Sequence, residues 1–155
     1  MPVSMRFRSQ RGFTLIEIML VVTVSGVLLL IGLPRLRDAV VRNNVYQSRV
    51  AVSAMYARAR AASIEQGRIG YLVVTGNRVA ALVRIAPDGT MPWADTIGVV
   101  EDLNARHGVT VTSTADTLRF DPRGFGLNGG NVTIAVTRGG IADTVVVSAF
   151  GRIQQ

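Results

Sequence analysis

The chain has 155 residues, a length typical of a single domain. Nearly half of the residues are apolar, only 17% are charged, and all 17 basic residues are arginine, which gives a net charge of +7. This composition excludes a disordered chain, which would be poor in apolar residues. The absence of cysteine excludes disulfides, thiolate metal sites and a cysteine nucleophile, and the single histidine, His107, excludes a multi-histidine metal site.

The first element in chain order is an apolar segment at residues 13–33, which reads FTLIEIMLVVTVSGVLLLIGL with Glu17 as its single charge. A helix of this length spans about 31 Å, the thickness of the hydrocarbon core of a bilayer. A buried globular helix is disfavoured because neither face is polar. A cleaved secretory signal is disfavoured because the apolar run continues past Ser25 and Gly26, the small residues that could end it. We therefore predict a transmembrane helix, although arginines on both sides leave its orientation nearly balanced.

Two residues of this segment need an explanation. A carboxylate such as Glu17 costs about 2.5–3.5 kcal/mol inside a bilayer, so a partner is expected. Its position near the segment edge also permits the alternative that it reaches the interface. Pro34 closes the segment, because its ring removes one backbone hydrogen bond and clashes with the carbonyl of Leu30.

The stretch Arg11–Glu17, followed by the apolar run to Pro34, resembles the class III signal of type IV pilins and pseudopilins. The resemblance implies that a prepilin peptidase and N-methyltransferase cuts after Gly12 on the cytoplasmic side and methylates Phe13. It also implies that Glu17 pairs with the N-terminal amine of a neighbouring subunit and that Pro34 is the family's helix-kinking proline.

The residues fit this chemistry independently of the resemblance. A lone glutamate in the membrane needs a cation, and cleavage between Gly12 and Phe13 creates an α-amino group at the depth of Glu17 in the next subunit. Removal of the leader takes away three arginines and leaves 14 against 10 acidic residues, a net charge of +4.

Residues 35–66 predict a helix that Gly67 ends. At 100° per residue its apolar side chains gather on two stripes. The first stripe contains Val41, Val45, Val52, Met55, Tyr56 and Ala59. The second contains Tyr46, Val50, Ala54, Ala57, Ala61 and Ile64. Two stripes suggest that one packs on the domain and the other on a partner, although alanine-rich stripes also arise from helix propensity alone.

After Gly67 the apolar period changes to two, which predicts strands. The expected strands are 69–74, 79–85, 109–112, 117–120, 131–137 and 144–149. Turns are expected at Gly76-Asn77, at Pro87-Asp88-Gly89 and at Arg138-Gly139-Gly140. Residues 90–107, which include Trp93, are expected to be irregular.

This β region resembles the GspH/FimT family, the H-type minor pseudopilins and related minor pilins. The resemblance rests on the turn 120–124, the glycine-rich loop after it, and the strand 145–148 followed by Gly151-Arg152. It implies an α+β, pilin-like fold in which a long N-terminal helix, transmembrane in its first half, packs on an antiparallel β-sheet head. Some pilus members bind DNA through Gly-Arg-x-Arg, but here Gln154 replaces the second arginine.

The expected organisation is a leader at 1–12, a transmembrane helix at 13–33, a helix continuing into the head at 34–66 and a periplasmic β domain at 67–155. The resemblance places the chain in the inner membrane as a single-pass protein, with its N-terminus cytoplasmic before cleavage.

Other candidate sites in the β region have plain alternatives. Arg119, Arg123, Arg138 and Arg152 could form a phosphate-binding patch, with Phe120, Phe125 and Phe150 as stacking surfaces. The favoured interpretation is that these arginines form a solvated face and that the phenylalanines belong to the core. His107 has no nucleophile or acid partner in the pattern, and neither a calcium loop nor a dinucleotide motif is present. We therefore expect no catalytic residues, no metal site, no cofactor and no enzymatic activity.

The favoured prediction is a structural minor pseudopilin of a type II secretion system. Its expected partners are the prepilin peptidase and other pseudopilins or pilins. The first alternative is a type IV pilus minor pilin for pilus biogenesis or DNA uptake, with Arg123, Arg138 and Arg152 as DNA contacts. The second is a membrane-anchored binding protein that does not polymerise.

Overall fold

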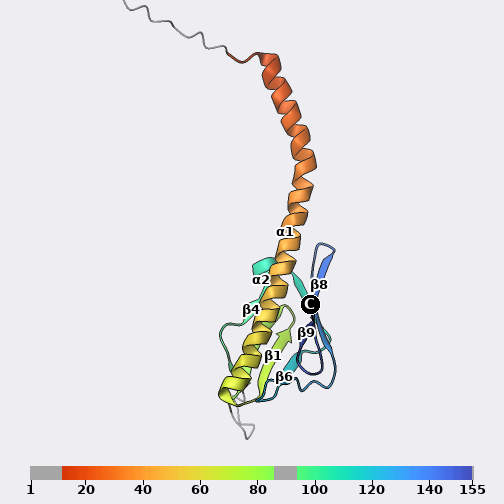
Figure 1. Ribbon diagram of the computed structural model, residues 1–155. Helices are drawn as coiled ribbons and strands as arrows, with labels where there is room; N and C mark the ends of the chain where they lie inside the picture. Colours follow the sequence, from red (N-terminus) through yellow and green to blue (C-terminus); the bar gives the residue numbers. More distant parts are fainter. Residues whose placement is uncertain (1–11, 86–93, 155) are drawn as a thin grey trace, which may run out of the picture. The chain divides into compact units, whose positions relative to one another are not determined.

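The computed structural model describes residues 12–85 and 94–154. Its longest element is the helix α1, Leu15–Gln66, which passes through Pro34 (Figure 1). Pro34 therefore closes the apolar segment without ending the helix, because a proline removes a single bond from the backbone ladder. The chain divides into two compact units between Asp38 and Ala39. We call the second unit, Ala39–Gln155, the head.

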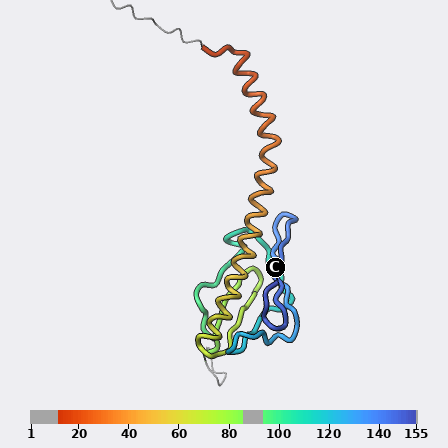
Figure 2. Tube along the Cα trace, viewed as in Figure 1, coloured from red at the N-terminus to blue at the C-terminus, as the bar shows by residue number. Residues whose placement is uncertain are grey.

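The head contains two antiparallel sheets (Figure 1). The first sheet has the order β3-β2-β1-β6, with β4 also beside β2, and comprises β1 Gly70–Thr75, β2 Arg78–Arg84, β3 Ala94–Thr96, β4 Glu101–Asp102 and β6 Thr117–Phe120. The second sheet has the order β5-β7-β8-β9 and comprises β5 Thr110–Ser113, β7 Val132–Arg138, β8 Ile141–Val147 and β9 Ile153–Gln154. The C-terminal end of the chain lies in the second sheet, beside β8 (Figure 2). The long helix with antiparallel sheets confirms the predicted α+β, pilin-like fold class.

Both predicted hairpin turns are present, but the second has two residues rather than three, because Arg138 pairs with Ile141 as the last residue of β7. Thr75 pairs with Arg78, so Gly76 and Asn77 form the turn between β1 and β2. In the second sheet Gly139 and Gly140 have φ angles of 56° and 81°, a combination that glycine adopts without steric cost. The predicted turn at 87–89 and Trp93 lie outside the described residues.

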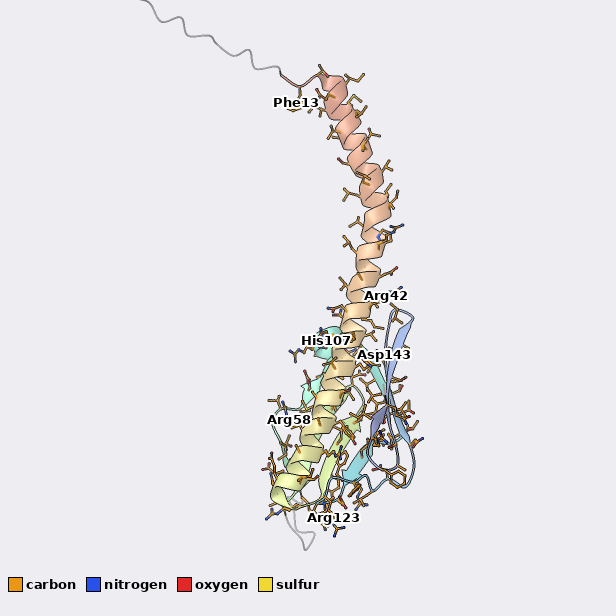
Figure 3. The ribbon with its side chains drawn as sticks, viewed as in Figure 1. Phe13, Arg42, Arg58, His107, Arg123 and Asp143 are labelled. Atoms are coloured by element: carbon orange, nitrogen blue, oxygen red, sulfur yellow. The ribbon has the colours of Figure 1, made fainter. Side chains whose placement is uncertain are left out.

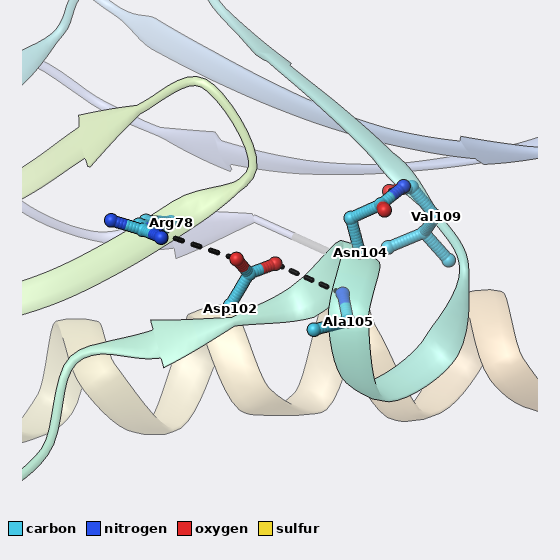
Figure 4. A network of polar contacts seen from close by, with 5 residues as sticks. All are labelled: Arg78, Asp102, Asn104, Ala105 and Val109. Carbon is cyan, nitrogen blue, oxygen red and sulfur yellow. Dashed lines mark hydrogen bonds and ion pairs between the residues drawn. The ribbon is translucent and has the colours of Figure 1, made fainter.

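The expectation that residues 90–107 are irregular is wrong for the described part, which forms β3, β4 and the helix α2, Leu103–His107. The Asp102 carboxylate starts α2 by accepting a hydrogen bond from the Ala105 backbone N–H at 2.9 Å (Figure 4). That bond, followed by contacts with Arg78, lowers the pKa of Asp102 below its ordinary value. The strands β3 and β4 and the helix α2 are too short to show a period of apolar residues, and a side-chain cap starts α2. The apolar pattern of the sequence therefore did not reveal these elements.

The core of the head lies where residues 45–59 of α1 meet both sheets. The helix contributes Val45, Val52, Met55, Tyr56 and Ala59, the first sheet contributes Leu72, Val74, Val79, Ala81, Leu118 and Phe120, and the second sheet contributes Val111, Val132, Ile134, Val136, Val145 and Val147. Leu103 and Val109 complete it. The whole core belongs to the head, so the head needs no side chain from residues 12–38 to form it.

One glycine allows α1 to approach the first sheet closely. A Cβ atom placed on Gly70 would lie 2.7 Å from the carbonyl oxygen of Ala59 and 2.8 Å from Cβ of Ser63. The obstructing atoms belong mainly to the helix backbone, which cannot swing aside. A side chain at position 70 would therefore force α1 and β1 apart.

Gly70→Ala should destabilise the head by about 1–3 kcal/mol, the usual cost of overpacking a core. Thermal unfolding of the full chain in detergent, followed by circular dichroism of the sheets, measures the change. Thr112→Ala, on an exposed strand position, is the control and should shift the midpoint little. A midpoint for Gly70→Ala equal to that of the parent chain would contradict the close approach.

Tyr56 ties α1 to the C-terminal turn of the head. Its buried hydroxyl donates a 2.7 Å hydrogen bond to the carbonyl oxygen of Gly151, and its ring meets Phe120 edge-on at 5.0 Å. Burial raises the pKa of Tyr56, and the nearby positive charge of Arg60 opposes this in part. The folded state therefore holds the phenolic proton more tightly than the unfolded chain does.

Because the folded pKa of Tyr56 lies above its unfolded value of about 10, the free energy of unfolding should fall as the pH rises above about 10. Tyr56→Phe should remove part of this fall and should cost about 1 kcal/mol at neutral pH through the lost hydrogen bond. Chemical denaturation at pH 7 and pH 11 tests both effects. Tyr46→Phe, at an exposed tyrosine, should change neither. An unchanged pH dependence in Tyr56→Phe would count against the assigned burial effect.

Candidate functional site

The start of α1 is fixed by its own sequence. Thr14 precedes the first helical residue, Leu15, and its Oγ1 accepts a 3.3 Å hydrogen bond from the backbone N–H of Glu17. A threonine cap with an acidic residue three positions later is a typical helix start, and a carboxylate in the first turn is favoured by the helix dipole. The helix therefore begins two residues after Phe13, beside the predicted cleavage position. Thr14 is missing from the sequence prediction, although its Thr-x-x-Glu spacing could have revealed it.

The first part of α1 exposes its apolar side chains on every face. All residues from Phe13 to Ile31 are exposed, and an 18-residue window of α1 has a mean hydropathy of 2.5 with none of that window buried. The helix is long and apolar enough to cross a membrane. A Cβ atom placed on Gly26 would meet no other atom within 4 Å, so this small residue leaves open surface rather than accommodating a contact in the chain.

Within the head, α1 presents one buried and one exposed apolar face. Of the first stripe, Val45, Val52, Met55, Tyr56 and Ala59 are buried and Val41 is half-buried. All six residues of the second stripe, Tyr46, Val50, Ala54, Ala57, Ala61 and Ile64, are exposed. The burial confirms that one stripe packs on the domain. We call the exposed stripe the outer helix face.

An ion pair fixes the second sheet to α1 beside the outer helix face. Arg49 Nε lies 3.1 Å from Asp143 Oδ2 on β8, and the arginine side chain is only 18% exposed. The same guanidinium lies over the ring of Tyr46, 5.4 Å from its centroid. A partly desolvated ion pair with a cation–π contact holds both side chains in one arrangement, so Tyr46 is oriented on the surface by its neighbours.

The structure keeps two arginines of the candidate phosphate-binding patch, Arg138 and Arg123, apart. Arg138 donates to the carbonyl oxygen of His107, near the end of the head where α1 enters. Arg123 lies at the opposite end, beyond the last turns of α1, as Figure 3 shows for Arg123 and His107. Arg138 therefore cannot join Arg123 in one phosphate site. The two arginines lie at different ends of the head because Arg138 is the last residue of β7, at the hairpin with β8, whereas Arg123 lies in the turn after β6.

Arg152 follows a turn that approaches the segment after Arg123, since a Cβ atom on Gly126 would lie 3.0 Å from the backbone nitrogen of Gly151. The Ser148 hydroxyl stabilises this turn by accepting a 3.0 Å hydrogen bond from the Arg152 backbone N–H. The expectation that the three phenylalanines are core residues is wrong for two of them. Phe120 is 1% exposed, whereas Phe125 is 54% and Phe150 is 75% exposed. Phe120 alternates inward on β6, but the other two occupy turns, where the period of two gives no information.

A groove on this end of the head was not foreseen from the sequence. It has a volume of about 340 Å³ and is lined by Tyr56, Ala57, Arg60, Ala61, Ile64 and Ile153. Its two parts are nearly a hundred residues apart, and only the helical spacing of Ala57, Arg60, Ala61 and Ile64 was visible in the sequence.

Within the described ranges 12–85 and 94–154, no group of three histidine, aspartate or glutamate side chains could hold a metal ion.

Comparison with known proteins relates both parts of the chain to pilin-like proteins. The model of the prokaryotic N-terminal methylation motif matches residues 7–33, and the model of the family described as type II transport protein GspH matches residues 47–151. Two curated proteins, each called fimbrial protein, of Pseudomonas aeruginosa are 40% identical to this chain over 58 residues. That alignment covers 37% of this chain and 38% of each relative, so the chain matches little more than a third of their length.

Two crystal structures of the type IV minor pilin FimU of Pseudomonas aeruginosa have the same fold. One aligns with a TM-score of 0.59 and 19% identity over 73% of this chain and 88% of FimU. The other aligns with a TM-score of 0.55 and 18% identity over 70% and 90% of the two chains. The family and fold are those of structural pilins. With a methylation motif ahead of a head that the GspH model matches over most of its length, the chain is a type IV pilin-like protein that belongs to the GspH family.

Proposed function

We propose that this chain is a structural minor pseudopilin of a type II secretion system, held in the inner membrane by residues 13–33 with its head in the periplasm. The observation that carries the proposal is the GspH match across residues 47–151 of the head. The methylation motif at 7–33 supports processing by a prepilin peptidase and assembly with other pilin-like subunits. The chemistry required of the chain is then association rather than catalysis.

The geometry at the start of α1 supports a role for Glu17 in assembly. After cleavage, the new amine on Phe13 lies just before the capped first turn that contains Glu17. In a low-dielectric membrane each of these charges is unfavourable alone and is stabilised by an opposite charge. Pairing the amine of one subunit with Glu17 of the next removes both costs at once and sets the axial position of the two helices.

The outer helix face supports a second contact in the same assembly. Its alanines allow another helix to approach closely, while Tyr46, Val50 and Ile64 offer apolar area at the ends of the stripe. Because the buried stripe already stabilises the head, the exposed one adds nothing to folding within a single copy. Helix propensity explains the alanines, but it does not explain an exposed tyrosine, valine and isoleucine in the same row.

The type IV pilus is the second candidate, and the FimU fold and the fimbrial proteins favour it. Deletion of the gene with complementation by the intact chain distinguishes the two systems. A secretion defect with normal pili supports the pseudopilin, whereas lost pili or lost DNA uptake with normal secretion supports the minor pilin. The order of neighbouring genes gives an independent indication.

Gly12→Arg should leave residues 1–12 attached, because a bulky charged side chain cannot occupy a site that accepts a minimal one. Mass spectrometry of the membrane protein should show the uncut chain without N-terminal methylation. Ser9→Arg, elsewhere in the leader, is the control and should be processed normally. Normal cleavage of Gly12→Arg would contradict the processing proposal and favour an anchored protein that does not polymerise.

Glu17→Ala should insert in the membrane at least as well as the parent chain, since a charge has been removed. Co-isolation with other pilin-like subunits should fall about tenfold, which corresponds to an ion pair of about 1.4 kcal/mol. Glu65→Ala, on an exposed part of α1 in the head, is the matched control. Undiminished co-isolation of Glu17→Ala would rule out the pairing role.

A further inference from the structure

The groove lined by Tyr56, Ala57, Arg60, Ala61, Ile64 and Ile153, which we call the Arg60 groove, lies between the last turns of α1 and the C-terminal strand. Three of its residues, Ala57, Ala61 and Ile64, also belong to the outer helix face. A subunit that covers the outer helix face therefore reaches the groove without a separate contact.

Two turns border the groove and are held there by close backbone approach. A Cβ atom on Gly124 would lie 2.8 Å from Cδ1 of Ile64 and 3.1 Å from Nε of Arg60, so the turn 121–125 rests directly on the helix. A Cβ atom on Gly126 would lie 3.0 Å from the backbone nitrogen of Gly151. The hydrogen bond from the Tyr56 hydroxyl to the carbonyl oxygen of Gly151 holds the second turn, 148–151, in place. The border of the groove is thus built into the fold.

The two turns that border the groove carry exposed apolar side chains, whereas turns are ordinarily polar. In the lining and the two border turns the exposed large apolar side chains are Ile64, Phe125 and Phe150, of which Phe150 is the most exposed. Turn tips can be built from any small polar residue, so two phenylalanines in adjoining turns are not needed to form them. Exposed apolar side chains that gather rather than scatter are typical of a contact surface.

Arg60 lines the groove, and Arg123 and Arg152 adjoin its border and lining residues in sequence; none of the three forms an ion pair among the described residues. The ion pairs among residues 12–85 and 94–154 use Arg49, Arg78 and Arg106, and none of them uses Arg60, Arg123 or Arg152. Nε of Arg60 is buried and finds no acceptor in this part of the chain. Two acids lie near these arginines in sequence: Asp121 accepts the backbone N–H groups of Arg123 and Phe125, and Glu65, at the end of α1, is exposed.

We propose that the Arg60 groove binds an acidic, apolar segment of a neighbouring pilin-like subunit. An apolar side chain of that segment occupies the groove against Ile64 and Ile153, and its carboxylates pair with Arg60, Arg123 and Arg152. The inference rests on the proposed function, because it takes the partner to be a subunit of the same filament. It assigns a partner chemistry and an orientation to the end of the head, beyond the contacts of the membrane helix.

Two other occupants fit less well. A second copy docked through the same surface would bring like charges together, since each copy presents the same three arginines. Nucleic acid would use the arginines and stack on the phenylalanines, but three cations neutralise few phosphates, and Tyr56, the aromatic residue among those that line the groove, is buried and offers a base no stacking surface.

The natural absence of cysteine allows a clean test with the full chain in membranes of cells that make the other subunits. A benzophenone maleimide attached to Phe150→Cys probes the groove border, and one attached to Val50→Cys probes the outer helix face. The crosslinked peptides are identified by mass spectrometry. We expect Phe150→Cys to join a pilin-like subunit at a segment with aspartate or glutamate beside apolar residues.

Arg60→Gln in the Phe150→Cys chain should reduce this adduct about tenfold, because the charge-assisted bond to the partner carboxylate is lost. Arg58→Gln is the control, since Arg58 lies two residues away and lines a different pocket. Phe125→Ser serves as a second disruptive variant if Arg60→Gln lowers the thermal midpoint, and it should reduce the adduct likewise.

Adducts of Val50→Cys with pilin-like subunits, together with none from Phe150→Cys, would overturn the groove while leaving the filament role intact. Absence of both adducts would instead count against the proposed function. Adducts of Phe150→Cys confined to a second copy of this chain would also overturn the groove proposal. So would submicromolar DNA binding that persists at physiological salt and falls in Arg152→Ala.

Discussion

Burial of one apolar stripe of α1 against both sheets is the interaction on which the rest of the structure depends. The described strands have at most seven residues and form two separate sheets. Each sheet has an apolar face that needs another element to bury it, and α1 buries part of both. The helix supplies Val45, Val52 and Ala59 to that shared core, and each large apolar side chain it buries contributes about 1.5–3 kcal/mol. The close approach at Gly70 and the Tyr56 bond to Gly151 both exist because the helix occupies this position.

Because α1 buries only one stripe in the head, two of its apolar regions stay exposed to solvent in a single copy of the chain. One is the exposed apolar first part of α1, which is long and apolar enough to cross a bilayer. The other is the outer helix face, which continues into the Arg60 groove. Since the head already has a complete core, neither region is needed for its folding. In the proposed assembly lipid covers the first region and a neighbouring subunit covers the second, which removes the free-energy cost of exposing both to water.

All basic residues of the chain are arginine, and this choice suits contacts at partly buried surfaces. A guanidinium keeps its charge when partly buried and presents donors in a planar fork, which suits contacts with carboxylates and aromatic rings. Arg49 uses this within the head, between Asp143 and Tyr46. Arg60 has the same chemistry at the groove but forms no ion pair among the residues that the structure describes. A cation held at a fixed place by apolar packing is suited to recognising a carboxylate from outside.

The sequence by itself determined the elements that follow from local periodicity and turn chemistry: the apolar helix, the two stripes of its second half and the two glycine hairpins. It also carried the N-terminal methylation motif at residues 7–33 and the Thr14–Glu17 spacing of a helix cap, because both depend on contiguous residues. Only the tertiary structure decided which side chains share a surface. It separated Arg138 from Arg123, exposed Phe125 and Phe150 on adjoining turns, and brought Ile153 to Arg60. Those outcomes depend on strand pairing and on backbone approach between segments nearly a hundred residues apart, which no local pattern encodes.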